Sequence, residues 1–124
     1  LNGFNLKLNN KIIEIFEELE LNKDILKKRI KNLCNSQLKI VLLIYLILNK
    51  KNIIVFDYFD KGLSFKVKKR IINYMKTKYN GIIIVVSNDL IFLNQLCSRI
   101  IVYKNCKIIL SYLSNSSIFF TLYN

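Results

Sequence analysis

The feature that most constrains the fold of this chain is an unbroken apolar run, Ile53–Phe56, which ends in the acid Asp57. Short apolar runs rich in β-branched and aromatic residues are typical of strands that are buried on both faces of a sheet. An acid at the carboxyl end of such a strand lies where open α/β sheets bind their ligands. Alternatively, the same residues form an ordinary core strand that is followed by a polar turn.

A second apolar run, Ile82–Val86, also predicts a buried strand, and it ends in Ser87, Asn88 and Asp89. Between the two runs the sequence predicts a basic amphipathic helix over residues 64–78. Buried strands that alternate with helices indicate a parallel sheet covered on both faces. We therefore predict an α/β fold in which the Asp57 strand lies in the middle of the sheet.

The remaining segments are predicted to be short helices, a β-hairpin and two weakly patterned ends. One helix stands out, over residues 37–49, because it is apolar nearly all round and is expected to be buried beneath a sheet. The other predicted segments are an irregular lead-in over residues 1–8, helices over 10–20, 23–31 and 90–97, hairpin strands over 100–103 and 107–110 across Asn105–Cys106, and a tail with a short helix from Ser116.

Composition excludes several classes of site. The 124 residues suit one domain or part of one, and 52% of them are hydrophobic. The sequence contains no histidine, which rules out a Ser-His-Asp triad, a Cys-His pair and an imidazole metal site. Cys34, Cys97 and Cys106 show no metal-ligand spacing and are interpreted as reduced thiols. The longest strongly apolar segment, Ile40–Leu48, is too short to span a bilayer, and no signal peptide is visible.

The formal net charge of +12 has two interpretations. A nucleic acid or an anionic membrane surface would be a suitable partner for so basic a chain. Alternatively, AT-rich codons have added lysines without forming a patch. The lysines are scattered and no aromatic residues are interleaved with them, which favours compositional drift and argues against nucleic acid as a partner.

Several segments match the motifs of one family in order and spacing. LCNSQ at Leu33–Gln37 occupies the place of the signature LSGGQ, and Gln37 precedes Asp57 by 20 residues. IIVFDYFDKGLS is similar to the Walker B and D-loop run φφφφDEPTSGLD, IIIVVSND to IIIVTHD, and IIVYKNCKII to the closing hairpin VIVLKNGKII. Together these segments resemble the C-terminal half of an ABC-transporter ATPase subunit.

The resemblance implies an α/β fold: a partial P-loop NTPase three-layer sandwich with a mostly parallel sheet and a C-terminal β-hairpin. Residues 1–124 would be a single partial domain, with a helical subdomain remnant and signature loop in 1–36 and the Walker B half of the ATPase core in 37–124. The cofactors would be ATP and Mg²⁺. The chain would lie peripherally on the cytoplasmic face of a membrane. Its partners would be a membrane permease subunit, a second ABC ATPase chain in a homo- or heterodimer, or a separate chain with the Walker A half.

By the same resemblance, Asp57 is the metal-binding Walker B acid. The nucleotide-binding positions are Leu33, Cys34, Asn35, Ser36, Gln37 and Ser64.

Departures from the family pattern predict an impaired enzyme. Tyr58 stands at the position of the catalytic Glu, Asn88 at the switch His, and no GxxxxGK[ST] phosphate loop is present. A neutral phenol cannot replace a carboxylate base at pH 7. We therefore predict a degenerate ATP-binding subunit that is inactive alone and that exposes apolar surface to an obligate partner. Two alternatives stay open: a non-catalytic interaction module that retains the ABC fold, and a basic, ribosome-associated RNA-binding protein.

Overall fold

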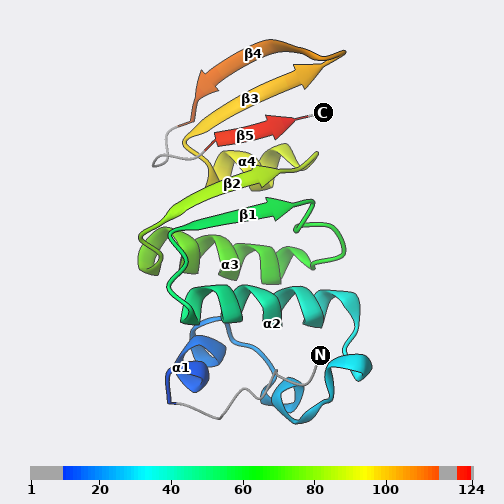
Figure 1. The fold of residues 1–124 in the computed structure, drawn as a ribbon, viewed down its shortest axis with the longest axis vertical. Helices are drawn as coiled ribbons and strands as arrows, with labels where there is room; N and C mark the ends of the chain where they lie inside the picture. The colour runs from blue at the N-terminus through cyan, green and yellow to red at the C-terminus, as the bar shows by residue number, and fades with distance from the viewer. Residues whose placement is uncertain (1–9, 115–119, 124) are drawn as a thin grey trace. The chain divides into compact units, whose positions relative to one another are not determined.

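A computed structural model describes residues 10–114 and 120–123, and it divides into two compact units, Leu1–Lys50 and Lys51–Asn124 (Figure 1). The predicted lead-in over residues 1–8 and the first part of the predicted tail helix lie outside the described residues. The division after Ser36 rests on the family resemblance and stays a prediction. Each unit is described below by itself.

The described part of the first unit is helical. Its elements are α1 (Asn10–Glu18), the 3-10 helices η1 (Lys23–Lys27) and η2 (Ile30–Asn32), and α2 (Asn35–Leu48). Helix α1 contacts α2 and buries Ile12, Ile15 and Phe16, as expected from a helical period. The continuous helix predicted over residues 23–31 is wrong, because Lys28 and Arg29 are extended and separate the two 3-10 turns. So short a segment gains little from helix propagation to offset the cost of nucleation.

Helix α2 begins earlier than predicted and is only partly buried. Its N-cap residue is Cys34. Ile40, Val41, Leu43 and Ile44 are buried, but the side chains of Leu42 and Tyr45 are 44% and 40% exposed. The expectation that this helix would be buried all round is therefore wrong, since a helix that packs on one side leaves the opposite side open. Within residues 10–114 and 120–123, no helix is both long enough and apolar enough to cross a bilayer.

The second unit is a mixed α/β structure, as the sequence predicts. Its strands are β1 (Ile53–Asp57), β2 (Ile82–Val86), β3 (Arg99–Lys104), β4 (Lys107–Leu113) and β5 (Phe120–Tyr123), in the order β1-β2-β5-β3-β4. β1 and β2 are parallel, β5 is parallel to both β2 and β3, and β3 and β4 are antiparallel. The strand β5 corrects the helix predicted from Ser116, as far as residues 120–123 are concerned.

The position of β1 contradicts the prediction that the Asp57 strand lies in the middle of the sheet. β1 stands at one end of the strand order and pairs only with β2 among the described residues. The sheet grows instead on the other side of β2, where β5 pairs with it. The apolar run predicted a strand correctly, but a run of residues carries no information on how many neighbours that strand has.

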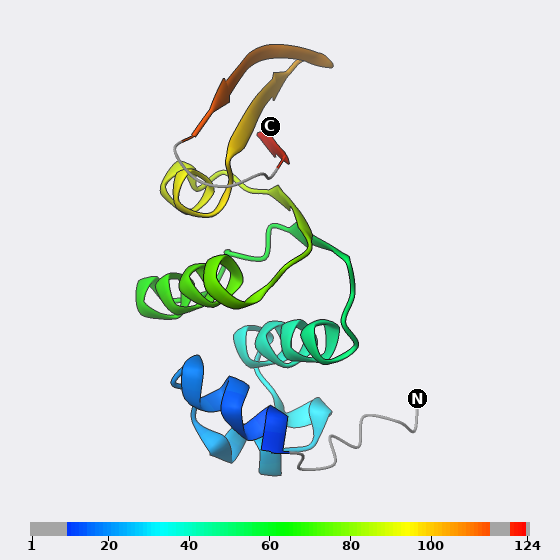
Figure 2. The same cartoon turned by 90° about the vertical axis from the view of Figure 1, so that its left-hand side faces the viewer.

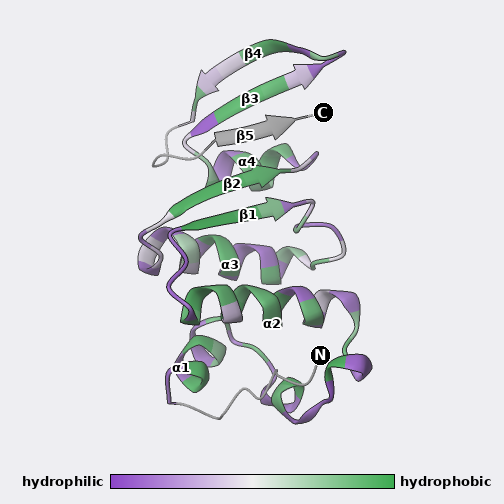
Figure 3. Ribbon diagram, viewed as in Figure 1, coloured by the Kyte–Doolittle hydropathy of each residue, from purple (hydrophilic) through white to green (hydrophobic). Residues whose placement is uncertain are grey.

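The two faces of the parallel pair also differ from the prediction. Helices α3 (Phe65–Lys78) and α4 (Leu90–Leu96) contact each other and lie on the same side of the strands (Figure 2). Ile54 and Phe56 of β1 are buried, whereas Ile53 and Val55, which alternate with them, are 56% and 59% exposed. Apart from Asp57 at the end of β1, the residues of both strands are hydrophobic (Figure 3). β1 therefore exposes one apolar face, and the expectation of burial on both faces is wrong for it.

The hairpin of β3 and β4 is confirmed and is longer than predicted. Its turn residues Asn105 and Cys106 both have positive φ, 50° and 58°. Two consecutive residues with φ in this region are typical of a type I′ turn, which matches the twist of the strands it joins. The predicted strands and turn residues therefore agree with the structure, and β4 continues to Leu113.

Candidate functional site

The carboxyl ends of β1 and β2 form the candidate site. In the parallel register Asp57, the last residue of β1, lies opposite Val86, the last residue of β2. Ser87, Asn88 and Asp89 follow Val86 directly and lead into α4. The fold thus brings together two segments, around Asp57 and Asn88, that the sequence singled out separately. This edge is where open α/β sheets bind ligands.

Tyr58 is held in an unusual conformation beside Asp57. Its φ of 48° lies in the left-handed region, which residues other than glycine seldom adopt. The Tyr58 backbone N–H donates to the carbonyl oxygen of Val86 at 2.9 Å, and the Lys61 ammonium lies 4.0 Å from the centre of the tyrosine ring. Contacts to β2 and Lys61 therefore hold Tyr58 in place directly after Asp57. The side chain at this position is a phenol and not a carboxylate.

The Asp89 carboxylate accepts hydrogen bonds from two neighbouring groups. Its carboxylate caps α4 by accepting from the Phe92 backbone N–H at 3.0 Å, and it accepts from the Lys68 ammonium at 2.7 Å. The hydrogen bond from Lys68, followed by the bond from Phe92, lowers the pKa of the Asp89 carboxyl below its usual value. The Asp89 backbone N–H donates to the buried Ser87 hydroxyl at 2.9 Å. Asn88, between them, is exposed.

Sequence reasoning missed Lys68, which falls within the basic amphipathic helix predicted over residues 64–78. The lysine lies near the start of α3, and α3 follows the carboxyl end of β1. An acid at the carboxyl end of the neighbouring strand is therefore within reach of a long side chain in the first turns of that helix. This placement, together with the scarcity of acids after residue 24, is the signal that could have predicted the Lys68–Asp89 pair.

Asp60 is a second residue that sequence reasoning missed. Its side chain is only 5% exposed, and its Oδ1 atom is buried without a hydrogen-bond partner among the described residues. It follows the stacked rings of Phe56 and Phe59, whose centroids are 4.5 Å apart. A buried acceptor without a donor destabilises a fold by about 1–3 kcal/mol. Nothing in the sequence pattern distinguishes Asp60 from a turn residue.

The remaining predicted residues of this unit are Ser64 and the metal-binding Asp57. The Ser64 hydroxyl accepts from the Val67 backbone N–H at 3.3 Å and so caps α3. Asp57 is exposed, and no group of three or more acidic, Cys or His residues that could hold a metal ion occurs in the described part of the chain. Mg²⁺ is commonly held by one or two carboxylates together with waters and substrate phosphates. Asp57 fits the role of a single protein ligand to an ion that a phosphate also binds.

The signature-like residues form a separate cluster in the first unit. The Cys34 backbone N–H donates to Gln37 Oε1 at 3.3 Å, and Cys34 Sγ lies 3.1 Å from Ser36 Oγ. The hydrogen bond with the Ser36 hydroxyl lowers the pKa of the exposed Cys34 thiol. Leu33 is half-buried and Asn35 is exposed. Cys34 and Gln37 form a capping box at the start of helix α2, and no glycine opens its first turn to close approach by a phosphate.

No protein-family model matches this chain, and a search of curated proteins found no match either. The interpretation of the site therefore depends on the geometry of the residues described above.

Proposed function

We propose that this chain is a degenerate ABC-type ATP-binding subunit, which resembles the energy-coupling component of a membrane transporter. The observation that carries the proposal is the register of β1 and β2, which sets Asp57 beside the Ser87–Asp89 segment at the carboxyl edge of a parallel pair. This is the edge at which the resemblance places the Walker B acid and the switch residue. Asp57 would contribute one carboxylate to Mg²⁺, and the Asn88 amide would hydrogen-bond a phosphate oxygen.

The proposed activity is binding without efficient hydrolysis. A water molecule that attacks a γ-phosphate needs a group to orient it or accept its proton. Tyr58 stands where the family has that carboxylate, and its backbone is fixed by the hydrogen bond to Val86. Asn88 is neutral and cannot stabilise developing charge as a cation would. We expect hydrolysis to be slower than in an intact family member by orders of magnitude.

The proposal also requires a partner. The edge of β1 that faces away from β2 pairs with no described strand. Ile53 and Val55 expose apolar side chains beside that edge. Exposed edges and apolar patches of this kind favour association with another chain. A permease subunit, a second ATPase chain or a chain with the Walker A half would be such a partner, at the cytoplasmic face of a membrane.

The second candidate is a non-catalytic interaction module that retains the fold but does not bind nucleotide. Its support is that Ser64 and Asp89 already act as helix caps. These polar groups are explained by local structure alone, without a ligand.

Nucleotide titration of the purified chain with and without Mg²⁺ distinguishes the two candidates. ATP binding is expected to depend on Mg²⁺, and Asp57→Ala is expected to weaken it at least about tenfold, equivalent to about 1.4 kcal/mol. Asp24→Ala is the matched control, because it removes the same charge from an exposed position in the first unit.

Each possible outcome of this titration decides between the candidates. The interaction module would be favoured if Asp57→Ala and Asp24→Ala changed the affinity for ATP equally, or if the wild-type chain did not bind ATP. Rapid ATP turnover by the wild-type chain, with Tyr58 and Asn88 in place, would contradict the degenerate subunit.

A further inference from the structure

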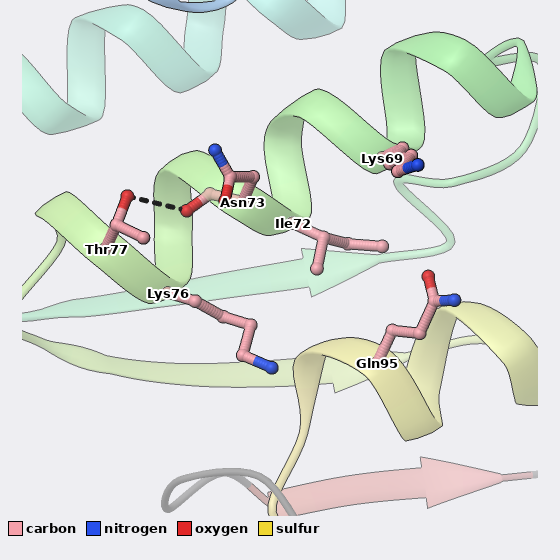
Figure 4. Close-up of a pocket in the computed structure, with 6 residues that line it drawn as sticks. All are labelled: Lys69, Ile72, Asn73, Lys76, Thr77 and Gln95. Atoms are coloured by element: carbon pink, nitrogen blue, oxygen red, sulfur yellow. Dashed lines mark hydrogen bonds between the residues drawn. The ribbon is translucent and has the colours of Figure 1, made fainter.

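Helices α3 and α4 form a shallow pocket, and five of its six lining residues are polar or charged. Its volume is about 350 Å³, and its lining residues are Lys69, Ile72, Asn73, Lys76, Thr77 and Gln95. The Lys76 side chain from α3 and the Gln95 side chain from α4 extend into the space between the two helices (Figure 4). The Thr77 hydroxyl donates to the Asn73 carbonyl oxygen at 2.8 Å, so its hydrogen is already used. The lining thus offers cationic and amide donors around a single apolar residue.

The pocket belongs to a longer row of donors on α3, which we call the α3 stripe: Lys66, Lys69, Asn73 and Lys76. Their spacing of three, four and three residues places them on one face of the helix, and all four are exposed. The row extends over about 15 Å, given a rise of 1.5 Å per residue. Helix α3 contains no acidic residue, and no described acid pairs with the three lysines of the stripe.

Lys68 is also a lysine of α3, but it does not belong to the stripe. It lies between Lys66 and Lys69 in sequence but on another face of α3, where it pairs with Asp89 at 2.7 Å. Of the four lysines between residues 66 and 76, Lys68 therefore pairs within the fold and the other three face solvent. The sequence shows these lysines as scattered, and the helix gathers three of them into a line.

The chemistry of the stripe fits phosphate groups better than other anions. Lysine, asparagine and glutamine side chains are common donors to phosphate oxygens. Planar carboxylates are recognised best by the two-pronged guanidinium of arginine, which the stripe lacks. An amphipathic helix that lies on a membrane does so through its apolar face. In α3 that face is buried at Ile71, Ile72, Tyr74 and Met75, and Phe65, at 69%, is the one exposed large apolar side chain of the helix. A row of this length also exceeds what a single phosphate can contact.

We propose that the α3 stripe binds the sugar-phosphate backbone of single-stranded nucleic acid. The second unit supports this with eleven basic and three acidic residues, a charge balance that attracts a polyanion. The stripe itself consists of lysine and asparagine side chains, and Phe65 at the start of α3 is the one exposed aromatic ring of the helix on which a base could stack. The contacts are therefore mainly with the sugar-phosphate backbone and independent of sequence. The inference does not depend on the proposed nucleotide site, which lies at the carboxyl edge of β1 and β2.

The salt dependence of oligonucleotide binding tests this inference. Fluorescence anisotropy would follow a labelled single-stranded RNA, with the chain titrated at a series of salt concentrations. The double variant K69Q/K76Q removes two phosphate contacts, so the slope of log K against log salt is expected to become shallower by about 1.4. Glutamine has a helix propensity close to that of lysine, so α3 is expected to remain folded, which circular dichroism checks.

The matched control is K104Q/K107Q, which removes the same charge from exposed lysines beside the hairpin turn. It is expected to leave the slope close to that of the wild type. An equal change of the salt-dependence slope in K69Q/K76Q and K104Q/K107Q would show that total charge, and not the stripe, governs binding. That result would overturn the proposal. So would an absence of RNA binding at low salt, or equal competition by polyglutamate or by vesicles with anionic lipids. The single variants K69Q and K76Q should each give about half the change.

Discussion

The parallel pair β1–β2 and the antiparallel hairpin β3–β4 belong to the same unit but are stabilised in different ways. In β1 and β2 the alternate residues Ile54, Phe56, Ile83 and Val85 are buried, and the strands are joined through α3. In β4 almost every residue is exposed, and a tight turn at Asn105–Cys106 joins it to β3. Parallel pairing depends on a long crossover that packs on the sheet, whereas a hairpin depends mainly on its turn and local pairing.

This contrast explains where the candidate site lies. The carboxyl ends of β1 and β2 are positioned by side chains that pack on α3 and α4, so Asp57 and Asp89 lie on a buried support. The hairpin offers no such support beneath β4. A site that must hold polar groups in fixed positions is better placed on the packed pair than on the hairpin.

The largest expected difference between the two regions comes from shortening a core side chain. Phe56→Ala removes a ring that is 2% exposed and stacks on Phe59, and it should lower the free energy of unfolding by about 3–5 kcal/mol. Leu110→Ala in β4, where the side chain is 53% exposed, should cost less than about 1 kcal/mol. Urea unfolding measures both values. Similar losses for the two variants would show that the hairpin is packed as tightly as the parallel pair.

A smaller effect is expected from the ion pair at the end of β2. Asp89→Asn keeps a residue that can cap α4 but removes the charge that accepts from Lys68. The pair is partly exposed, at 22% and 28% for the two side chains, so the loss of stability at pH 7 should be about 1 kcal/mol.

The pH dependence of this effect has a definite sign. The lowered pKa of Asp89 means that its stabilisation is fully present above the unfolded-state pKa, about 3.9, and declines as the pH falls through the folded-state value. The difference in stability between wild type and Asp89→Asn should therefore shrink below about pH 4. Thermal unfolding from neutral to acid pH measures it, and a constant difference over that range would rule out the charge as its cause.

The smallest effect is expected at the hairpin turn. Cys106 has a φ of 58°, and a non-glycine residue in this region is strained by about 1 kcal/mol. Cys106→Gly should relieve that strain and raise the unfolding free energy by up to about 1 kcal/mol. Cys106→Ala, which keeps the Cβ atom, is the control and should change little. Destabilisation by the glycine variant would indicate that the cysteine side chain has contacts that outweigh the strain.

The elements of the second unit were largely predictable because their signals are local. Two short β-branched runs predicted β1 and β2, and the Asn105–Cys106 turn between extended segments predicted the hairpin. The errors fall where the outcome depends on neighbours: the helix over residues 23–31 divides into 3-10 turns, and the tail residues 120–123 form β5 between β2 and β3. Strand pairing between distant segments has no signature in either segment alone.

The candidate site was predictable in part for the same reason. Asp57 and Asn88 stand out because each directly follows or lies close to the end of an apolar run. The engagement of Asp89 by Lys68 and the burial of Asp60 involve side-chain positions that the spacing of residues does not specify. The sequence predicted a basic face for the helix over residues 64–78, but it did not indicate the pocket that Lys69 and Lys76 line beside α4.

By itself, the sequence determined the alternation of strands and helices in the second unit, the acid at the end of β1 and the absence of a phosphate loop. Tertiary structure alone decided that β1 is the end strand of the sheet formed by the described residues, and that Ile53 and Val55 are exposed. The physical reason is that a side chain's preference for a strand or helix arises within a few residues, whereas burial depends on which other segments are present to cover it.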